Sequence, residues 1–191
     1  MIENTLTFIK DEVNKFMNLK TGSSDLLEEK VVLSNIVNTD QNVAMGLPND
    51  KMVLSLICIE EERHLKSQDH YTRTTEGKLF TANPELRFNL YVLFAAHFTH
   101  ANYSEALKFL GLTLKFFQSK NVFDTKEYPE LGDEVKRLIV DLHTQPIEQQ
   151  SQLWQAMGGK FLPSIMYKIR MLAINEQAGQ LETTRISEVQ K

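Results

Sequence analysis

The sequence predicts an α/β domain of the α+β kind, in which one mixed β-sheet of about four to six strands packs against an N-terminal helix and a central helix. Two segments have apolar residues at the three- and four-residue spacing of a helix, and the segments between them are β-branched or alternate between apolar and polar residues as strands do. A fold with helices packed on a sheet contains both patterns. The 191 residues suffice for one domain, which at this size buries roughly 70% of its unfolded surface. Hydrophobic residues make up 42% of the chain, as in ordinary globular proteins, so we expect a packed core.

Three segments are expected to be helical. Met1 to Leu19 carries apolar residues at helical spacing with charged residues mostly between them. A more buried helix is expected from Asn102, which like Ser104 is suited to cap it, to Ser119. A short helix begins at Thr144–Pro146, where proline is tolerated, and ends near Met157. The stripe of the central helix is expected to be Ala106, Leu107, Leu110, Leu114 and Phe117, broadened by Phe109, Leu112 and Phe116.

Five segments are expected to be strands, in order Val31–Val37, Met52–Ile59, Leu86–His97, Val135–His143 and Ser164–Ile174. Met52–Ile59 is apolar at nearly every position, as in a strand covered on both faces, before Glu60 to Glu62 lead it into solvent. Thr39–Asp50 is expected to be a loop, and Leu65–Pro84 a long functional one. We place the domain at residues 1–176 and a polar tail, strand-adding or disordered, at 177–191.

Charge and cysteine content narrow the function classes. The chain has 21 basic and 25 acidic residues and a net charge of −4, which argues against a nucleic-acid-binding protein. No apolar run approaches the roughly 18 residues of a membrane span, and no secretory signal is visible, so we expect no membrane partner and a cytoplasmic protein. Cys58, the one cysteine, lies in an apolar run and is expected to be buried and inert.

The stretch Gly158-Gly159-Lys160 invites comparison with a phosphate-binding loop. A nucleotide-hydrolase loop needs a glycine four positions before Gly-Lys and a hydroxyl after it, but Trp154 and Phe161 stand at those places. A dinucleotide loop needs a strand before and a helix after, the reverse of the order expected here. We therefore expect these glycines to end a helix, with Lys160 complementing its last carbonyls.

Other candidate chemistry is weaker. His97 and His100 have no cysteine or acidic residue beside them, so a metal site is not predicted. Consecutive residues of a strand point to opposite faces, so Glu60, Glu61 and Glu62 are expected to be solvated and not to form a catalytic pair. No glycine-flanked nucleophilic serine is present. The residues therefore predict neither enzymatic activity nor a cofactor.

Several segments, in order, carry a resemblance to a known family. They are "MIENTLTFIKDEVNKFM", "VVLSNIV", "ANPELRFNLYVLFAAHF", "YSEALKFLGLTLKFFQSKNVF" and "LWQAMGGKFLPSIMYKIRML". Together they resemble the cap, or tail-terminator, family of contractile injection systems, which are phage-tail-like particles of bacteria. The resemblance covers roughly Met1 to Glu176, with Asn83-Pro84, "NYSEALKFL" and Trp154 with Gly158 and Pro163 among its most specific parts.

The resemblance implies a non-enzymatic subunit in a hexameric ring that ends the inner tube and engages the last sheath layer. The expected partners are further copies of the chain, the tube protein and the sheath protein; whether a second, larger cap paralogue takes part stays open. The particle that contains it is released or membrane-anchored. Long polar loops and a tail that alternates like a strand suit such contacts. The candidate contact residues are Arg63, Arg73, Lys78, Asn83, Leu181, Arg185 and Ile186.

Two other functions stay open from the sequence. One is a small-molecule- or nucleotide-binding α/β domain that uses Gly158, Gly159 and Lys160. The other is an adaptor or chaperone that binds a sheath subunit through a free strand edge.

Overall fold

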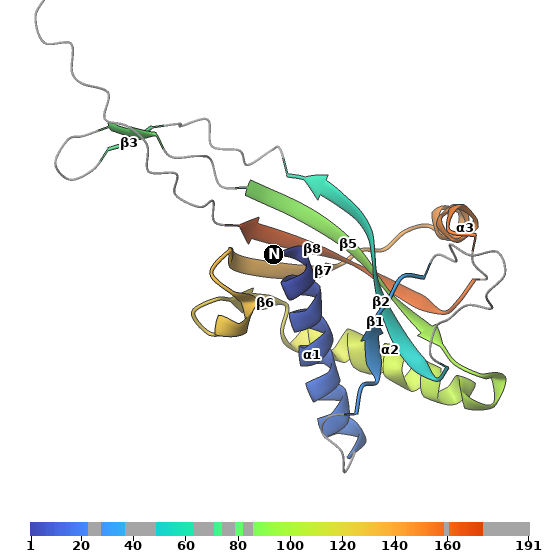
Figure 1. The fold of residues 1–191 in the computed structure, drawn as a ribbon. Coiled ribbons are helices and arrows are strands. Elements are labelled where there is room, and N and C mark those ends of the chain that lie inside the picture. The colour runs from blue at the N-terminus through green and yellow to red at the C-terminus, as the bar shows by residue number, and fades with distance from the viewer. Residues whose placement is uncertain are drawn as a thin grey trace, which may run out of the picture.

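A computed structural model describes residues 1–22, 28–36, 49–62, 71–73, 79–81, 86–158 and 161–173 (Figure 1). Within these residues the chain forms three α-helices, two short 3₁₀ helices and eight strands. The helices are α1 (Ile2–Thr21), α2 (Tyr103–Ser119) and α3 (Ile147–Ala156), with η1 (His100–Asn102) and η2 (Pro129–Leu131). The strands are β1 (Val31–Leu33), β2 (Lys51–Glu61), β3 (Tyr71–Arg73), β4 (Leu79–Thr81), β5 (Leu86–His97), β6 (Val122–Asp124), β7 (Val135–Leu142) and β8 (Ser164–Ala173).

The main sheet has six strands in the order β1-β2-β5-β8-β7-β6. β1 is parallel to β2, and every other pair in this sheet is antiparallel, so the sheet is mixed. β3 and β4 form a separate two-stranded antiparallel sheet. The predicted fold class, one mixed sheet with an N-terminal and a central helix, is confirmed. The last strand, β8, lies between β5 and β7 in the middle of the sheet.

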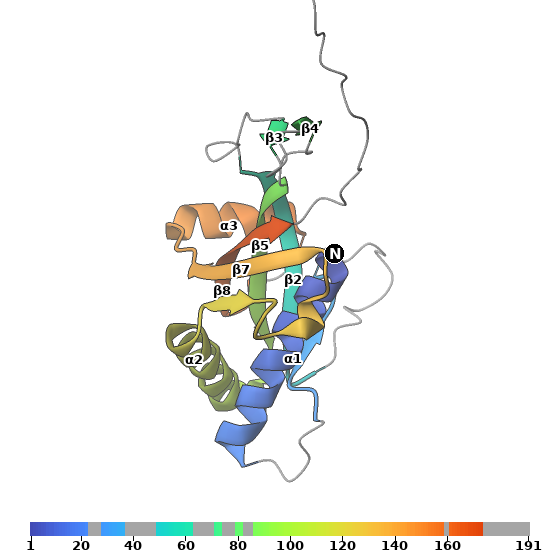
Figure 2. The ribbon, with the colours of Figure 1, turned by 90° about the vertical axis from the view of Figure 1, so that its left-hand side faces the viewer.

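One face of the sheet packs against α1 and α2 (Figure 2). The alternation of β5 directs Leu90, Val92 and Phe94 to this face, where they are fully buried. Helix residues at three- and four-residue spacing, such as Ile9, Val13 and Met17 of α1, fill the other side of the core. Aromatic rings contact each other edge to face, for example Phe8 with Phe123 at 5.5 Å between ring centroids. This face holds the larger of two hydrophobic clusters.

The other face is covered by α3 over part of its area. Trp154 of α3, 3% exposed, anchors a smaller cluster that also contains Ile36, Val53, Leu93, Ala95, Met157 and Met166. Leu93 and Ala95 belong to it because they alternate with the β5 residues of the first face. The short helix expected between Thr144 and Met157 is confirmed as α3, which begins directly after Pro146.

The predicted stripe of α2 is wrong in two positions. Leu107 and Leu114 are 49% and 40% exposed, whereas Thr113 is fully buried. Thr113 fits the core because its hydroxyl donates a hydrogen bond of 3.0 Å to the carbonyl oxygen of Phe109 in the preceding turn. The buried face of the helix is therefore Ala106, Phe109, Thr113, Phe116 and Phe117.

Two further expectations are corrected along β2. Met52 to Ser55 are buried, but Cys58 and Ile59 are exposed, so the strand is covered on both faces over its first half only. Cys58 is therefore exposed, not buried. The pairing of β2 with β5 shifts between Leu56 and Cys58, which places Cys58 opposite Tyr91 on the face that α3 covers only in part. The three-residue strands β3, β4 and β6 were not expected.

Among the residues that the structure describes, no helix is long and apolar enough to cross a membrane.

Candidate interaction surfaces

Gly158 ends a helix, as expected. It is the second residue after α3, has φ of 66°, and donates its N–H to the carbonyl oxygen of Gln155. Glycine is favoured at this left-handed position because it has no β-carbon. A helix precedes it and β8 follows, which is the reverse of the order in a dinucleotide loop. Gly159 and Lys160 lie outside the described residues, so the part predicted for Lys160 stays a prediction.

The described residues contain no group of three or more histidine, cysteine, aspartate or glutamate side chains able to hold a metal ion. His97 ends β5, and His100 begins η1. Glu60 and Glu61 are exposed, and Glu60 accepts a hydrogen bond of 2.9 Å from the Tyr91 hydroxyl. Partial burial, and secondly this bond, raise the pKa of Tyr91. Glu60 is thus part of a surface contact.

Of the seven predicted contact residues, Arg63, Lys78, Asn83, Leu181, Arg185 and Ile186 lie outside the described residues. Arg73 ends β3, where its backbone pairs with Leu79 of β4. The part that all seven residues play in partner contacts stays a prediction.

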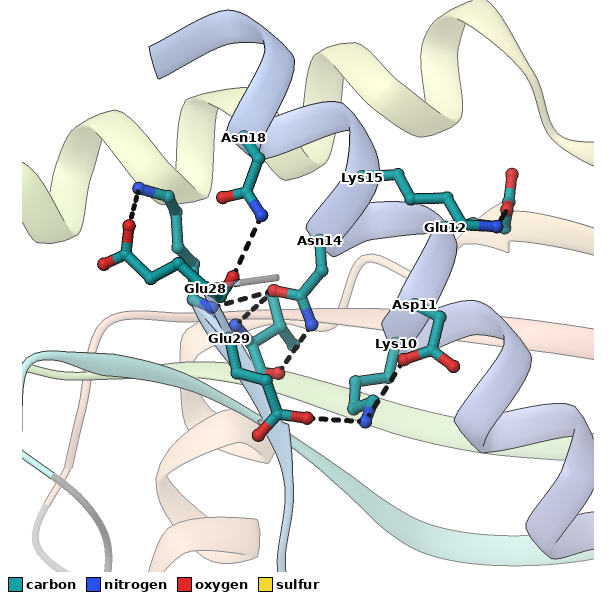
Figure 3. A network of polar contacts seen from close by, with 10 residues as sticks. Lys10, Asp11, Glu12, Asn14, Lys15, Asn18, Glu28 and Glu29 are labelled. Atoms are coloured by element: carbon teal, nitrogen blue, oxygen red, sulfur yellow. Dashed lines mark hydrogen bonds and ion pairs between the residues drawn. The ribbon is translucent and has the colours of Figure 1, made fainter. Parts of the chain in front are cut away.

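The outer edge of β1 is closed by a side chain of α1 (Figure 3). Asn14 Oδ1 accepts hydrogen bonds of 2.8 Å from the backbone N–H groups of both Lys30 and Val31. Asn14 Nδ2 donates a bond of 2.9 Å to the carbonyl oxygen of Val31. Asn14 is 7% exposed, so three backbone groups are satisfied away from solvent. This amide takes the place of a neighbouring strand at Val31.

The same region holds further contacts between α1 and the segment before β1 (Figure 3). Asn18, one helical turn after Asn14, donates a bond of 3.0 Å to the carbonyl oxygen of Glu28. Lys10 forms ion pairs with Glu29 at 2.9 Å and with Asp11 at 3.2 Å. The hydrogen bond to Glu29 is the main cause that raises the pKa of Lys10. Two asparagines on the apolar stripe of α1, beside Val13 and Met17, were the sequence signal for this edge.

The part of the sheet that α3 leaves uncovered is a polar face. Arg137 of β7 pairs with Asp124 of β6 at 3.0 Å, and Arg170 of β8 pairs with Asp141 of β7 at 2.7 Å. The pKa of Asp124 is lowered, first by the backbone N–H of Lys126 and then by Arg137. Exposed pairs of this kind add little stability. Their regular placement across neighbouring strands instead gives a surface with fixed charges.

The solvent side of α2 forms a third surface, which we call the α2 outer surface and define as Tyr103, Leu107, Gly111 and Leu114. Tyr103 is 51% exposed, more than the two leucines. At its C-terminal end lies a groove of about 460 Å³ between α2 and the ends of β7 and β8. Its apolar lining comprises Leu114, Phe117, Val140, Leu142 and Tyr167. Burial raises the pKa of Tyr167 to about 12.

Comparison with known proteins gives the family. The model of the Pvc16 N-terminal domain family matches residues 5–188. One similar solved structure is the PVC sheath/tube terminator of an extracellular contractile injection system in its extended state, with 14% identity and a TM-score of 0.48, covering 94% of this chain and 62% of that chain. Another is the tube-terminating cap of the anti-feeding prophage, with 14% identity and a TM-score of 0.49, covering 82% of this chain and 55% of that one. No curated protein matches the chain.

This chain therefore spans about three fifths of the length of the first of these structures and a little over half of the second. The resemblance found in the sequence covers roughly Met1 to Glu176, and the family match includes nearly all of these residues. The chain belongs to the Pvc16 N-terminal domain family.

Proposed function

We propose that the chain is a structural terminator subunit of a contractile injection system, which ends the inner tube and contacts the last sheath layer. The observation that carries this proposal is the family match over residues 5–188. The sheath/tube terminator and the tube-terminating cap named above have the functions that their descriptions state, and we extend that role to this chain.

The described surfaces are consistent with a subunit that works through contacts. The polar face and the α2 outer surface both carry solvent-exposed side chains, and they lie on different sides of the sheet. A subunit that must meet a tube, a sheath and its own copies needs several separate surfaces. Neither alternative drawn from the sequence, a nucleotide-binding domain or a sheath chaperone, is favoured by the family match.

Within this role we propose a non-enzymatic subunit that forms a ring of six copies. Its partners are the tube protein and the sheath protein, and a second, larger cap paralogue in particles that have one. The subunit is made in the cytoplasm and built into the particle there.

The proposal is tested with the chain and a tube subunit of a contractile injection system. Tube subunits are assembled alone or with increasing amounts of the chain, and tube lengths and ends are measured by electron microscopy. A terminator shortens the length distribution in proportion to its concentration and leaves a ring at one end of each tube. The mass of the chain is measured in parallel by mass photometry. Unchanged tube lengths together with a strictly monomeric chain would refute the proposal.

A further inference from the structure

The α2 outer surface is apolar where a solvent-facing helix is normally polar. Tyr103, Leu107 and Leu114 are 51%, 49% and 40% exposed. With the partly buried Leu110, these residues are spaced by four, three and four positions, the repeat by which two helices pack side by side. Past Leu114 this seam runs into the groove lined by Leu142 and Tyr167.

Gly111 lies within this seam, between Leu107 and Leu114. A β-carbon added at Gly111 would meet no other atom within 4 Å, so no described contact of the chain requires glycine there. Glycine in a helix interior is less favourable than alanine, which makes its presence costly for the chain alone. A position without a side chain between two exposed leucines allows a second backbone to approach closely.

The groove offers a polar contact in apolar surroundings. Tyr167 is 2% exposed and lines the groove together with the amide side chains of Gln118 and Asn121. Such amides can form hydrogen bonds with the backbone of a segment that enters the groove.

Charges at the border of the surface indicate which partner fits. Lys108 and Lys115 are exposed on the solvent side of the seam, and neither forms an ion pair with a described residue. Glu105, in the first turn, complements the helix dipole. In an antiparallel two-fold pair of α2 helices, Lys108 of one copy would face Lys115 of the other, and like charges oppose such a contact. The surface therefore fits acidic neighbours better than a second copy of itself.

We propose that the α2 outer surface and its groove bind one amphipathic helix of another polypeptide, whose apolar face is bordered by acidic residues. The helix lies along the seam, crosses α2 closest at Gly111, and inserts an apolar side chain beside Tyr167. This is recognition of a helix by a groove. The inference goes beyond the proposed function, because it assigns a binding site and a ligand chemistry that the terminator role does not specify.

The test uses two synthetic helical peptides that share a leucine stripe at the same three- and four-residue spacing. One carries glutamates beside the stripe, and its twin carries lysines at those positions. Fluorescence anisotropy with the full chain at low salt should show the acidic peptide binding at least tenfold more tightly. Gly111→Leu should weaken this binding at least tenfold without unfolding the chain, since the added β-carbon meets no other atom within 4 Å. Gln152→Leu, which adds the same side chain to an exposed position of α3, is the matched control and should change nothing.

A second experiment reverses the charges beside the seam. Lys108→Glu combined with Lys115→Glu should reverse the preference, so that the lysine peptide binds more tightly. Equal binding of both peptides, no binding of either, or no effect of Gly111→Leu would overturn the proposal. So would a dimer of the chain that Gly111→Leu abolishes, or binding to anionic phospholipid vesicles that Gly111→Leu abolishes. All of these outcomes are distinct from a failure of tube termination, which is measured without peptides.

Discussion

Replacing Asn14 by leucine tests the closed edge of β1. Leucine has a similar size but forms none of the three hydrogen bonds that Asn14 makes with Lys30 and Val31. Each of these backbone groups then loses a partner at a site where the side chain is only 7% exposed. At about 1–2 kcal/mol for each lost bond, the loss is roughly 3–6 kcal/mol. Extra apolar burial by leucine offsets on the order of 1–2 kcal/mol, so we expect the free energy of unfolding to fall by about 3 kcal/mol.

Asn14→Asp refines the test. A carboxylate still accepts hydrogen bonds from the N–H groups of Lys30 and Val31, but it loses the donor to the Val31 carbonyl. We therefore expect a loss smaller than that of Asn14→Leu. Asn4→Leu, on the exposed side of α1, is the matched control and should change stability by less than about 0.5 kcal/mol.

Urea unfolding followed by circular dichroism measures these differences, provided that the dependence on urea concentration stays the same. Hydrogen exchange adds a local readout, because the amides of Lys30 and Val31 should lose protection before the rest of the sheet in Asn14→Leu. A loss below about 1 kcal/mol for Asn14→Leu, or an equal loss for aspartate and leucine, would refute the reasoning that hydrogen bonding by Asn14 holds this edge.

Three more predictions concern single side chains. Burial raises the pKa of Tyr167 to about 12 from its ordinary 10.0, so the folded state binds this proton more tightly than the unfolded state. The stability that this group contributes is complete below pH 10 and should be lost as the pH rises toward 12. Denaturant titrations over this pH range should show a smaller decline for Tyr167→Phe. Trp154→Ala should lower the free energy of unfolding by about 3–5 kcal/mol, because Trp154 is 3% exposed in its cluster; a loss under about 1 kcal/mol would contradict that packing. Cys58 is exposed, so Ellman's reagent should modify one thiol per native chain within minutes, whereas a thiol that reacts only in denaturant would contradict its exposure.

The long periodic elements could be predicted from the sequence because their spacing reports burial directly. β5 and β8 alternate over their whole length, and α1 repeats every three to four residues, so their type and position were confirmed. β6 could not be predicted, since Val122 to Asp124 is too short to show alternation and forms only by pairing with β7. β3 and β4 are also three residues long and could not be predicted for the same reason.

The candidate surfaces were harder to predict than the fold. On α2, hydrophobicity alone placed Leu107 and Leu114 inside, and no local pattern shows that Thr113 is buried through its bond to Phe109. The exposure of Cys58 follows from a register shift against β5, which is a property of the pair of strands. The role of Asn14 had a visible signal, a polar residue on an apolar stripe, but its partners in β1 required the structure.

The position of β8 determines when this chain can become folded during synthesis. β8 pairs with both β5 and β7, so it fills the centre of the sheet. Its residues, 164–173, are also the last described residues of the chain, so they are synthesised after all the other strands. Until these residues leave the ribosome, β5 and β7 each present an apolar strand edge without a neighbour, the arrangement most prone to misassociation. A chain released from the ribosome before Ala173 should therefore aggregate instead of reaching the folded state.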